Sequence, residues 1–186
     1  MTVSIQSTDL EGVKVITTSI HRDVRGFFSE LYNAKDLKEL GIQIDFCQEN
    51  HSFSKYKNTL RGLHMQSPPY AQTKLVRCGR GSFLDIFVDI RKNSPTYKQW
   101  GTQKISFANK KQILIPEGFL HGFLTLSDNT EIIYKCSSFY SIQHEVSVAF
   151  NDPELSIDWG FDSQTHLYIS DKDRNASLLR DIINPY

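Results

Sequence analysis

The chain has 186 residues, which is enough for one domain with a hydrophobic core and short for two. Hydrophobic residues make up 39% and charged residues 23%, as in ordinary globular proteins, and 21 basic side chains balance 21 acidic ones. This neutral balance gives no electrostatic reason to expect nucleic acid as a partner, and no apolar run approaches the ~20 residues that a membrane helix needs.

The three cysteines, Cys47, Cys78 and Cys136, are widely spaced and form no C-x-x-C pair. Small secreted proteins with disulfide frameworks usually contain an even number of cysteines. The N-terminal residues also lack the layout of a secretory signal peptide. We therefore expect reduced thiols and a cytoplasmic location, with no attachment to a membrane.

A helical pattern first occurs at residues 33–40, where Leu37 and Leu40 lie three apart and Gly41 ends the turn. Beyond it, short apolar runs between Gly, Pro, Asn and Ser predict strands. In residues 82–90 both alternating sets of positions carry large apolar side chains, which indicates a strand buried on two sides. The other predicted strands are residues 73–78, 103–107, 112–115 and 131–136, and a terminal helix is predicted over residues 173–183. Short strands at this regular spacing predict an all-β sandwich or barrel.

Polar side chains occur at positions that such a barrel would turn inward. If residues 59–66 form a strand, His64 shares a face with Gly62, and Lys74 and Tyr134 fall on apolar faces of later strands. His121 follows a Pro/Gly turn at the start of another strand. Each residue alone has an ordinary structural explanation, but inward polar groups are costly unless they are paired or used. The sequence therefore allows these side chains to converge on one lumen.

Several stretches also follow a recognisable pattern in order and spacing. They are Asp23-x-Arg25-Gly26-x-Phe28-x-Glu30, Gln48-x-Asn50-x-Ser52-x-Ser54, Leu60-Arg61-Gly62-Leu63-His64-x-Gln66, Gln72-x-Lys74-Leu75-Val76, Asp85-x-x-Val88-Asp89-x-Arg91-x-x-Ser94-Pro95-Thr96, Pro116-x-Gly118-Phe119-x-His121-Gly122-Phe123, Tyr134-Lys135, Asn151-Asp152-Pro153-x-Leu155-x-Ile157-x-Trp159 and Ser170-x-Lys172-Asp173. With them the chain resembles the dTDP-4-dehydrorhamnose 3,5-epimerase family, the deoxysugar epimerases of the cupin superfamily. The resemblance implies one cupin-type jelly-roll β-barrel domain over residues 1–186, all-β with a few short helices.

The resemblance also implies an isomerase that inverts C3 and C5 of a nucleotide-linked 4-keto-6-deoxyhexose, converting dTDP-4-keto-6-deoxyglucose to dTDP-4-keto-rhamnose. His64 would be the base that removes a proton beside the ketone, with Asp173 as its orienting partner and Asp171 as the competing candidate. Lys74 would stabilise the enolate oxygen, and Tyr134 would return a proton to the opposite face. No redox cofactor and no metal are implied, because the substrate carries its own activating ketone.

Further positions match substrate contacts of the family. Arg61 would bind the diphosphate, although strict alternation places it opposite His64, so a bulge or the strand entry has to re-aim it. In this family the site borrows residues from a neighbouring subunit, which implies a homodimer. The remaining contacts implied by the resemblance are Arg25, Glu30, Gln48, Asn50, His121, Glu145 and Lys172, with Phe28 and Tyr140 as stacking residues.

Alternatives remain open. The chain departs from the family pattern at residues 140–145, which lack a proline, and at Gly160 after Trp159. These departures leave open a different loop shape and a different nucleotide sugar. An enzyme that inverts C3 or C5 alone is also open, because the same base and acid serve one inversion or two. A metal-dependent cupin isomerase or dioxygenase would need H-x-H where this chain has His64-Met65-Gln66. A binding module without chemistry would not need His64, Lys74, Tyr134 and Asp173 together.

Overall fold

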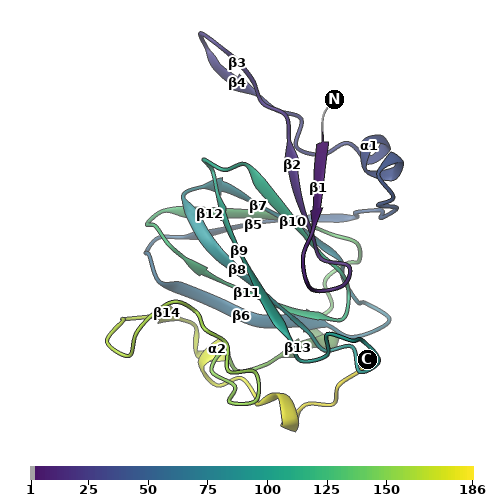
Figure 1. The fold of residues 1–186 in the computed structure, drawn as a ribbon. Coiled ribbons are helices and arrows are strands. Elements are labelled where there is room, and N and C mark those ends of the chain that lie inside the picture. The colour runs from purple at the N-terminus through teal and green to yellow at the C-terminus, as the bar shows by residue number, and fades with distance from the viewer. Residues whose placement is uncertain (1–2) are drawn as a thin grey trace.

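The computed structural model describes residues 3–186, and two facing β-sheets form the body of the molecule (Figure 1). The first sheet has the strand order β1-β2-β10-β7-β12-β5, and its neighbouring strands are antiparallel. Its strands are β1 (Val3–Ser7), β2 (Lys14–Thr18), β5 (Gln48–Ser54), β7 (Lys74–Arg80), β10 (Lys111–Ile115) and β12 (Thr130–Cys136).

The second sheet has the order β13-β6-β11-β8-β9, and β14 pairs in parallel with β6. A separate two-stranded hairpin is formed by β3 (His21–Asp23) and β4 (Gly26–Phe28). The strands of the second sheet are β6 (Thr59–Gln66), β8 (Ser82–Asp89), β9 (Trp100–Ser106), β11 (Phe119–Thr125), β13 (Glu145–Ser147) and β14 (Tyr168–Ile169). The two sheets face each other as in a cupin jelly roll, and the expected fold class is confirmed.

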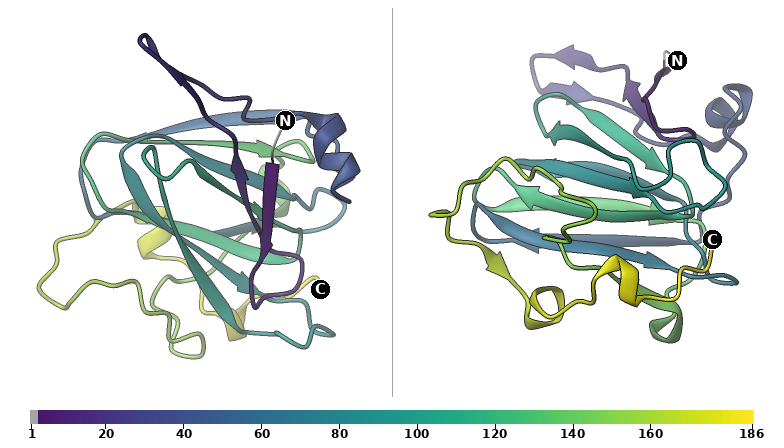
Figure 2. Two further views of the ribbon diagram at one scale, coloured as in Figure 1. Left: turned by 45° about the horizontal axis from the view of Figure 1, so that its top comes forward. Right: turned by 60° about the horizontal axis from the view of Figure 1, so that its bottom comes forward.

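Apolar side chains fill three layers, and β8 borders two of them. Phe83 and Phe87 pack between the sheets, whereas Ile86 and Val88 pack on the outer face of the second sheet. That outer face is covered by the C-terminal segment, including Trp159 (Figure 2). The two-sided burial predicted for residues 82–90 is confirmed. A third cluster lies outside the first sheet.

Helix α1 (Ala34–Glu39) belongs to that third cluster, where its Leu37 is buried. Asn33 caps the helix, because its side chain accepts hydrogen bonds from the backbone N–H groups of Lys35 and Asp36. The helix predicted at residues 33–40 is confirmed within one residue at each end. Among residues 3–186, no helix is long and apolar enough to cross a membrane.

The predicted terminal helix over residues 173–183 is wrong. The structure has only α2 (Asp171–Arg174) and the 3₁₀ helix η2 (Leu179–Asp181) there, and a further 3₁₀ helix, η1 (Ile142–His144), occurs earlier. Between α2 and η2 the backbone bonds other parts of the fold: Ser177 bridges Val148, and the Leu179 N–H donates to Asp152 Oδ2. These tertiary hydrogen bonds replace the ones that a continuous helix would make.

Strand β6 is irregular at Gly62. In β11, His121 and Phe123 are two residues apart. Their partners in β6, His64 and Arg61, are three residues apart. The extra residue is a β-bulge, and it turns both Arg61 and His64 toward the space between the sheets, as expected for a re-aimed Arg61. Gly62 has φ +120°, and a Cβ there would lie 2.5 Å from the Gly122 Cα.

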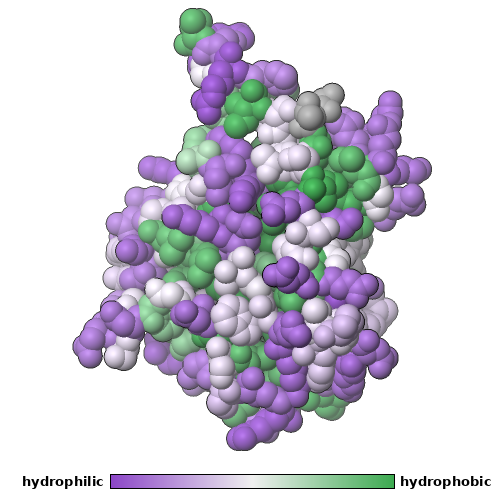
Figure 3. Space-filling view, viewed as in Figure 1, coloured by the Kyte–Doolittle hydropathy of each residue, from purple (hydrophilic) through white to green (hydrophobic). Residues whose placement is uncertain are grey.

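The β3–β4 hairpin projects away from the barrel (Figures 1 and 2), and every residue from His21 to Phe28 is exposed. At its base the Lys110 ammonium contacts two aromatic rings, 4.0 Å from the Phe27 centroid and 3.1 Å from the Phe107 centroid. Figure 3 shows apolar surface at the tip of this hairpin and again further down the arm, which carries the exposed rings of Phe27 and Phe28. An exposed arm of this composition is suited to contact another chain.

We predict that Gly62→Ala destabilises the fold strongly. The backbone conformation and the contact with Gly122 both oppose a Cβ, so the expected cost is about 3 kcal/mol or more. Gly41→Ala is the matched control, because Gly41 also has positive φ (+82°) but open space around it. It should cost about 1 kcal/mol. Equal losses in denaturant unfolding would show that the bulge needs no close approach of β6 and β11.

Candidate active site

A cavity of about 760 Å³ opens between the two sheets. Its walls come from β5, β6, β7, β11 and β12, together with residues 166–174 of the C-terminal segment. A smaller cavity of about 90 Å³ shares His64, Lys74 and Tyr134 with it. Of the residues expected at the site, the larger cavity is lined by Arg61, His64, Lys74, His121, Tyr134, Lys172 and Asp173, and the smaller one adds Gln48, Asn50, Tyr140 and Glu145.

His64 is paired with Asp173 rather than with Asp171. Its Nε2 lies 2.6 Å from Asp173 Oδ1, whereas Asp171 is exposed and its backbone carbonyl accepts a hydrogen bond from Asn175. Asp173 Oδ2 accepts a hydrogen bond from the Gly62 N–H at 3.3 Å. Burial acts to raise the pKa of Asp173, but these hydrogen bonds outweigh it, so the pKa lies below its usual value. An ionised carboxylate therefore fixes the orientation of the imidazole.

Lys74 and Tyr134 belong to the facing sheet, on the neighbouring strands β7 and β12. Burial lowers the pKa of Lys74, although Cys136, Asp85 and Glu145 act in the opposite direction. Burial also raises the pKa of Tyr134, so its phenol stays protonated at neutral pH. One wall of the cavity thus offers an imidazole, and the facing wall offers a lysine amino group and a protonated phenol.

A second buried pair joins His121 to Asp85, a residue that the sequence did not single out for the site. His121 Nε2 lies 2.8 Å from Asp85 Oδ1, and Asp85 is 0% exposed. Burial raises the pKa of Asp85 despite the attraction of His121 and Lys74. Its Oδ2 has no hydrogen-bond partner among residues 3–186. The sequence indicated Asp85 through its position between Phe83 and Phe87, which places its carboxylate on the same inner face of β8 as the two rings.

Ser52 is a further polar residue that the sequence reasoning did not assign to the site. It belongs to β5 and lines the larger cavity. Its Oγ is buried without a hydrogen-bond partner in the described chain. The signal was the alternation of Gln48, Asn50 and Ser52 along one strand, which places three polar side chains on the same face.

At the end of the smaller cavity, Glu145 connects two of the expected substrate contacts. Its Oε1 lies 2.6 Å from the Lys172 ammonium, and its Oε2 accepts a hydrogen bond from the Tyr140 hydroxyl at 3.0 Å. Gln48 donates to Asn50 Oδ1 at 3.0 Å on the adjacent β5. The structure therefore brings together all the expected site residues that lie after residue 47.

Arg25, Phe28 and Glu30 are not brought to this cavity. Arg25 is paired with Asp23 at the tip of the hairpin, and Phe28 is 68% exposed. Glu30 accepts a hydrogen bond from Asn33 near the start of α1. The hairpin carries the first two away from the barrel of their own chain (Figure 1).

Within residues 3–186, no group of three or more His, Cys, Asp or Glu side chains could hold a metal ion. His64 and His121 each face a different aspartate instead.

A family model described as dTDP-4-dehydrorhamnose 3,5-epimerase matches residues 7–181. The chain is 47% identical over 173 residues to the protein of that name from Salmonella typhimurium, covering 92% of this chain and 93% of the relative. A crystal structure of the Bacillus anthracis enzyme with TDP and PPi bound has a TM-score of 0.92 at 43% identity, covering 96% and 100% of the two chains. The structure of a Legionella pneumophila enzyme in complex with dTDP-4-keto-L-rhamnose has a TM-score of 0.92 at 43% identity, covering 98% of this chain and 95% of the other.

The two aspartates that are paired with histidines, Asp173 and Asp85, should respond oppositely to neutralisation. The pKa of Asp173 lies below its unfolded value of about 3.9, so its ionised form stabilises the fold at pH 7. Asp173→Asn should cost about 1–3 kcal/mol at pH 7, and the difference should shrink as the pH falls below about 4.

The pKa of Asp85 is raised, so its ionised form costs stability at neutral pH, and Asp85→Asn should leave the melting temperature unchanged or higher. Thermal melts of both variants from about pH 4 to pH 8 measure these effects. A loss of stability at pH 7 in both would contradict the assignment.

Proposed function

The chain belongs to the dTDP-4-dehydrorhamnose 3,5-epimerase family, and we propose that it inverts C3 and C5 of dTDP-4-keto-6-deoxyglucose to give dTDP-4-keto-rhamnose. The observation that carries this proposal is the facing arrangement in one cavity of His64 on β6 and of Lys74 and Tyr134 on β7 and β12. Epimerisation needs a base and an acid on opposite faces of one carbon, and these two walls supply them.

In the first step His64 takes the proton from the carbon beside the C4 ketone. Asp173 accepts a hydrogen bond from the imidazole Nε2, which leaves the lone pair on the other ring nitrogen free to act as the base. The electrons of the broken C–H bond move onto the C4 oxygen, giving an enolate. Lys74 stabilises that oxygen, and a poorly solvated ammonium does so more strongly than one in water.

In the second step the enolate carbon receives a proton from the other face. Tyr134 donates it, because burial keeps the phenol protonated until the enolate forms. The centre is inverted, and the proton on His64 and the negative charge on Tyr134 are then reset with solvent. The same cycle at the carbon on the other side of the ketone inverts the second centre.

The nucleotide end of the substrate is proposed to lie along Arg61 and Lys172. Arg61 makes a hydrogen bond only to the Phe53 carbonyl among the described residues, so its guanidinium remains available for a diphosphate. The TDP and PPi held by the Bacillus anthracis enzyme support dTDP as the nucleotide here. The three free cysteines are compatible with the predicted cytoplasmic location.

A single-centre epimerase is the second candidate. A 3′-monoepimerase from Streptomyces bikiniensis in complex with dTDP-quinovose has a TM-score of 0.85 at 31% identity. The same fold and one acid–base pair could therefore serve an enzyme that inverts one centre or an enzyme that inverts two. The higher identity to the 3,5-epimerases, 47% and 43%, favours two inversions.

We also propose that the protein works as a homodimer in which the hairpin of one subunit completes the cavity of the other. This would explain why Arg25 and Phe28 are exposed on an arm that leaves its own barrel. Glu30, at the foot of the same arm, would follow them to the interface.

Incubation of the protein with dTDP-4-keto-6-deoxyglucose in deuterated water should place deuterium at both C3 and C5, detected by NMR. His64→Ala should abolish the exchange, and Tyr134→Phe should slow inversion by roughly a hundredfold or more. Exchange at one carbon alone would establish the single-centre alternative. No exchange at either carbon would overturn the proposed reaction.

The shared site predicts complementation between inactive variants. His64→Ala subunits keep an intact hairpin, and Arg25→Ala/Phe28→Ala subunits keep an intact base. Random re-pairing of equal amounts makes half of the dimers mixed, each with one complete site, so roughly a quarter of wild-type activity should return. Mixtures no more active than the separate variants would show that the hairpin serves its own chain or no site.

A further inference from the structure

The loop between β12 and η1 is held by glutamine side chains instead of by a β-ladder. Four consecutive residues, 138–141, each have a backbone group bonded to a glutamine amide. The glutamines are Gln48 on β5, Gln66 on β6 and Gln72 just before β7, and all three line the smaller cavity. We refer to these three residues as the glutamine cradle.

Gln66 makes most of the contacts. Its Nε2 donates to the Tyr70 carbonyl at 2.6 Å and to the Phe139 carbonyl at 3.1 Å, and its Oε1 accepts from the Ser141 N–H at 2.7 Å. The residue is 4% exposed. It lies two positions after His64, so the strand that carries the proposed base also fixes the loop. A buried amide with both donors used is costly to replace by an apolar side chain.

The other two members bond the residues between. Gln72 Nε2 donates to the Ser138 carbonyl at 2.8 Å, and Gln48 Oε1 accepts from the Tyr140 N–H at 2.9 Å. The bonds thus run without interruption along the loop, from three separate elements of the barrel. Backbone groups that would otherwise need water are satisfied by the protein, and the loop has one defined path.

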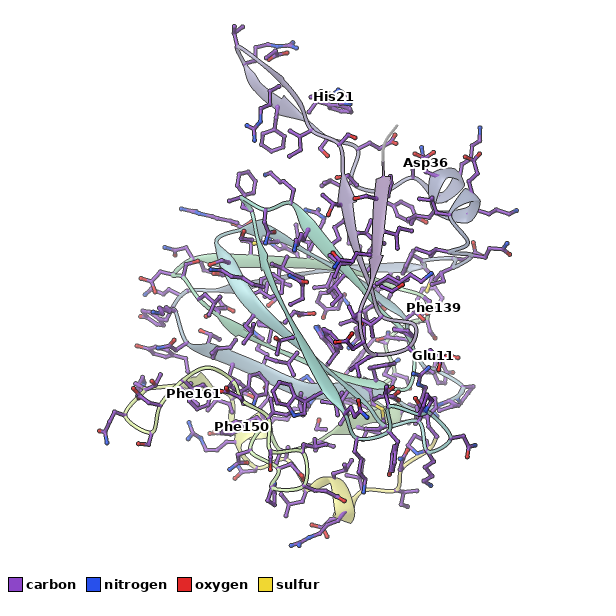
Figure 4. The ribbon with its side chains drawn as sticks, viewed as in Figure 1. Glu11, His21, Asp36, Phe139, Phe150 and Phe161 are labelled. Atoms are coloured by element: carbon purple, nitrogen blue, oxygen red, sulfur yellow. The ribbon has the colours of Figure 1, made fainter. Side chains whose placement is uncertain are left out.

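The held loop presents aromatic side chains outward. Phe139 is 65% and Tyr140 54% exposed, and Figure 4 shows Phe139 at the margin of the barrel, far from His21 of the hairpin. The Tyr140 ring is further fixed by its hydroxyl, which donates to Glu145. A large ring held rigidly at a cavity rim suits stacking on a planar group, because little conformational entropy is lost on binding.

We propose that Gln66 and Gln72 are positioning residues that hold Tyr140 as a preorganised stacking surface for the nucleobase of the substrate. The inference rests on the proposed function, since it takes a nucleotide sugar as the ligand. Because the cradle acts on a binding surface and leaves His64, Lys74 and Tyr134 in place, it should control affinity for the nucleotide more than the rate of the chemical step.

The test uses the full chain and dTDP as the probe, with titration calorimetry for Kd and steady-state kinetics for kcat and KM. Gln66→Leu should raise the Kd of dTDP and the KM of the sugar nucleotide about tenfold or more, with kcat changed less than about threefold. Gln72→Leu, which removes one bond, should show a smaller change in the same direction. Gln103→Leu is the matched control, because the half-buried Gln103 side chain on β9 donates only to the Lys104 carbonyl within residues 3–186 and makes no bond to the loop, so neither constant should change.

A double-mutant cycle distinguishes positioning from general stabilisation. If Gln66 acts through Tyr140, then Gln66→Leu in a Tyr140→Ala background should change the Kd of dTDP by less than about twofold. The affinity for inorganic pyrophosphate, which has no base to stack, should stay at the wild-type value in Gln66→Leu. If Gln66→Leu does not fold, the same cycle is run with Gln72→Leu.

Three results would overturn the inference: an unchanged Kd in the single variants, equal effects with and without Tyr140, or a parallel loss of pyrophosphate affinity. A wild-type protein that binds no dTDP would instead overturn the proposed function, and this inference with it. That outcome is read before any variant is made, so the two failures are distinguishable.

Discussion

The site depends on one interruption of a β-ladder, at Gly62 in β6. Because glycine lets β6 pass close to Gly122 of β11, the strand gains a residue and turns both Arg61 and His64 inward. The Gly62 N–H then bonds Asp173, whose other oxygen bonds His64. The C-terminal segment that covers the outer face of the sheet is thereby connected to the His64 imidazole. A regular β6 without the bulge would place Arg61 and His64 on opposite faces of the sheet.

The interior polar groups differ in what they contribute to stability. Asp173 is held ionised by its hydrogen bonds, whereas burial opposes the charged forms of Lys74, Asp85 and Tyr134. Such groups weaken a fold and are usually retained for function. The apolar layers on both sides of β8 provide the stability that this cavity does not.

Local patterns predicted the regular parts of this molecule well. Alternation identified the strand later seen as β8, and Leu37, Leu40 and Gly41 identified α1, because the apolar spacing and the helix stop are local features. The terminal helix failed since Asp173, Ser177 and Leu179 follow tertiary partners that no helical period reveals. Resemblance to a family supplied the candidate residues of the cavity. It assigned no site role to Asp85, Gln66 or Gln72, whose roles depend on partners distant in the sequence.

The central claim is that a base and an acid act on opposite faces of one ketone-bearing ring. A crystal structure of the protein with dTDP-4-keto-rhamnose bound tests it most directly. The account predicts the His64 imidazole on one face of the sugar, the Tyr134 hydroxyl on the other, and the Lys74 ammonium within hydrogen-bonding distance of the C4 oxygen. A sugar ring with both side chains on the same face, or with its ketone outside the cavity, would contradict the account.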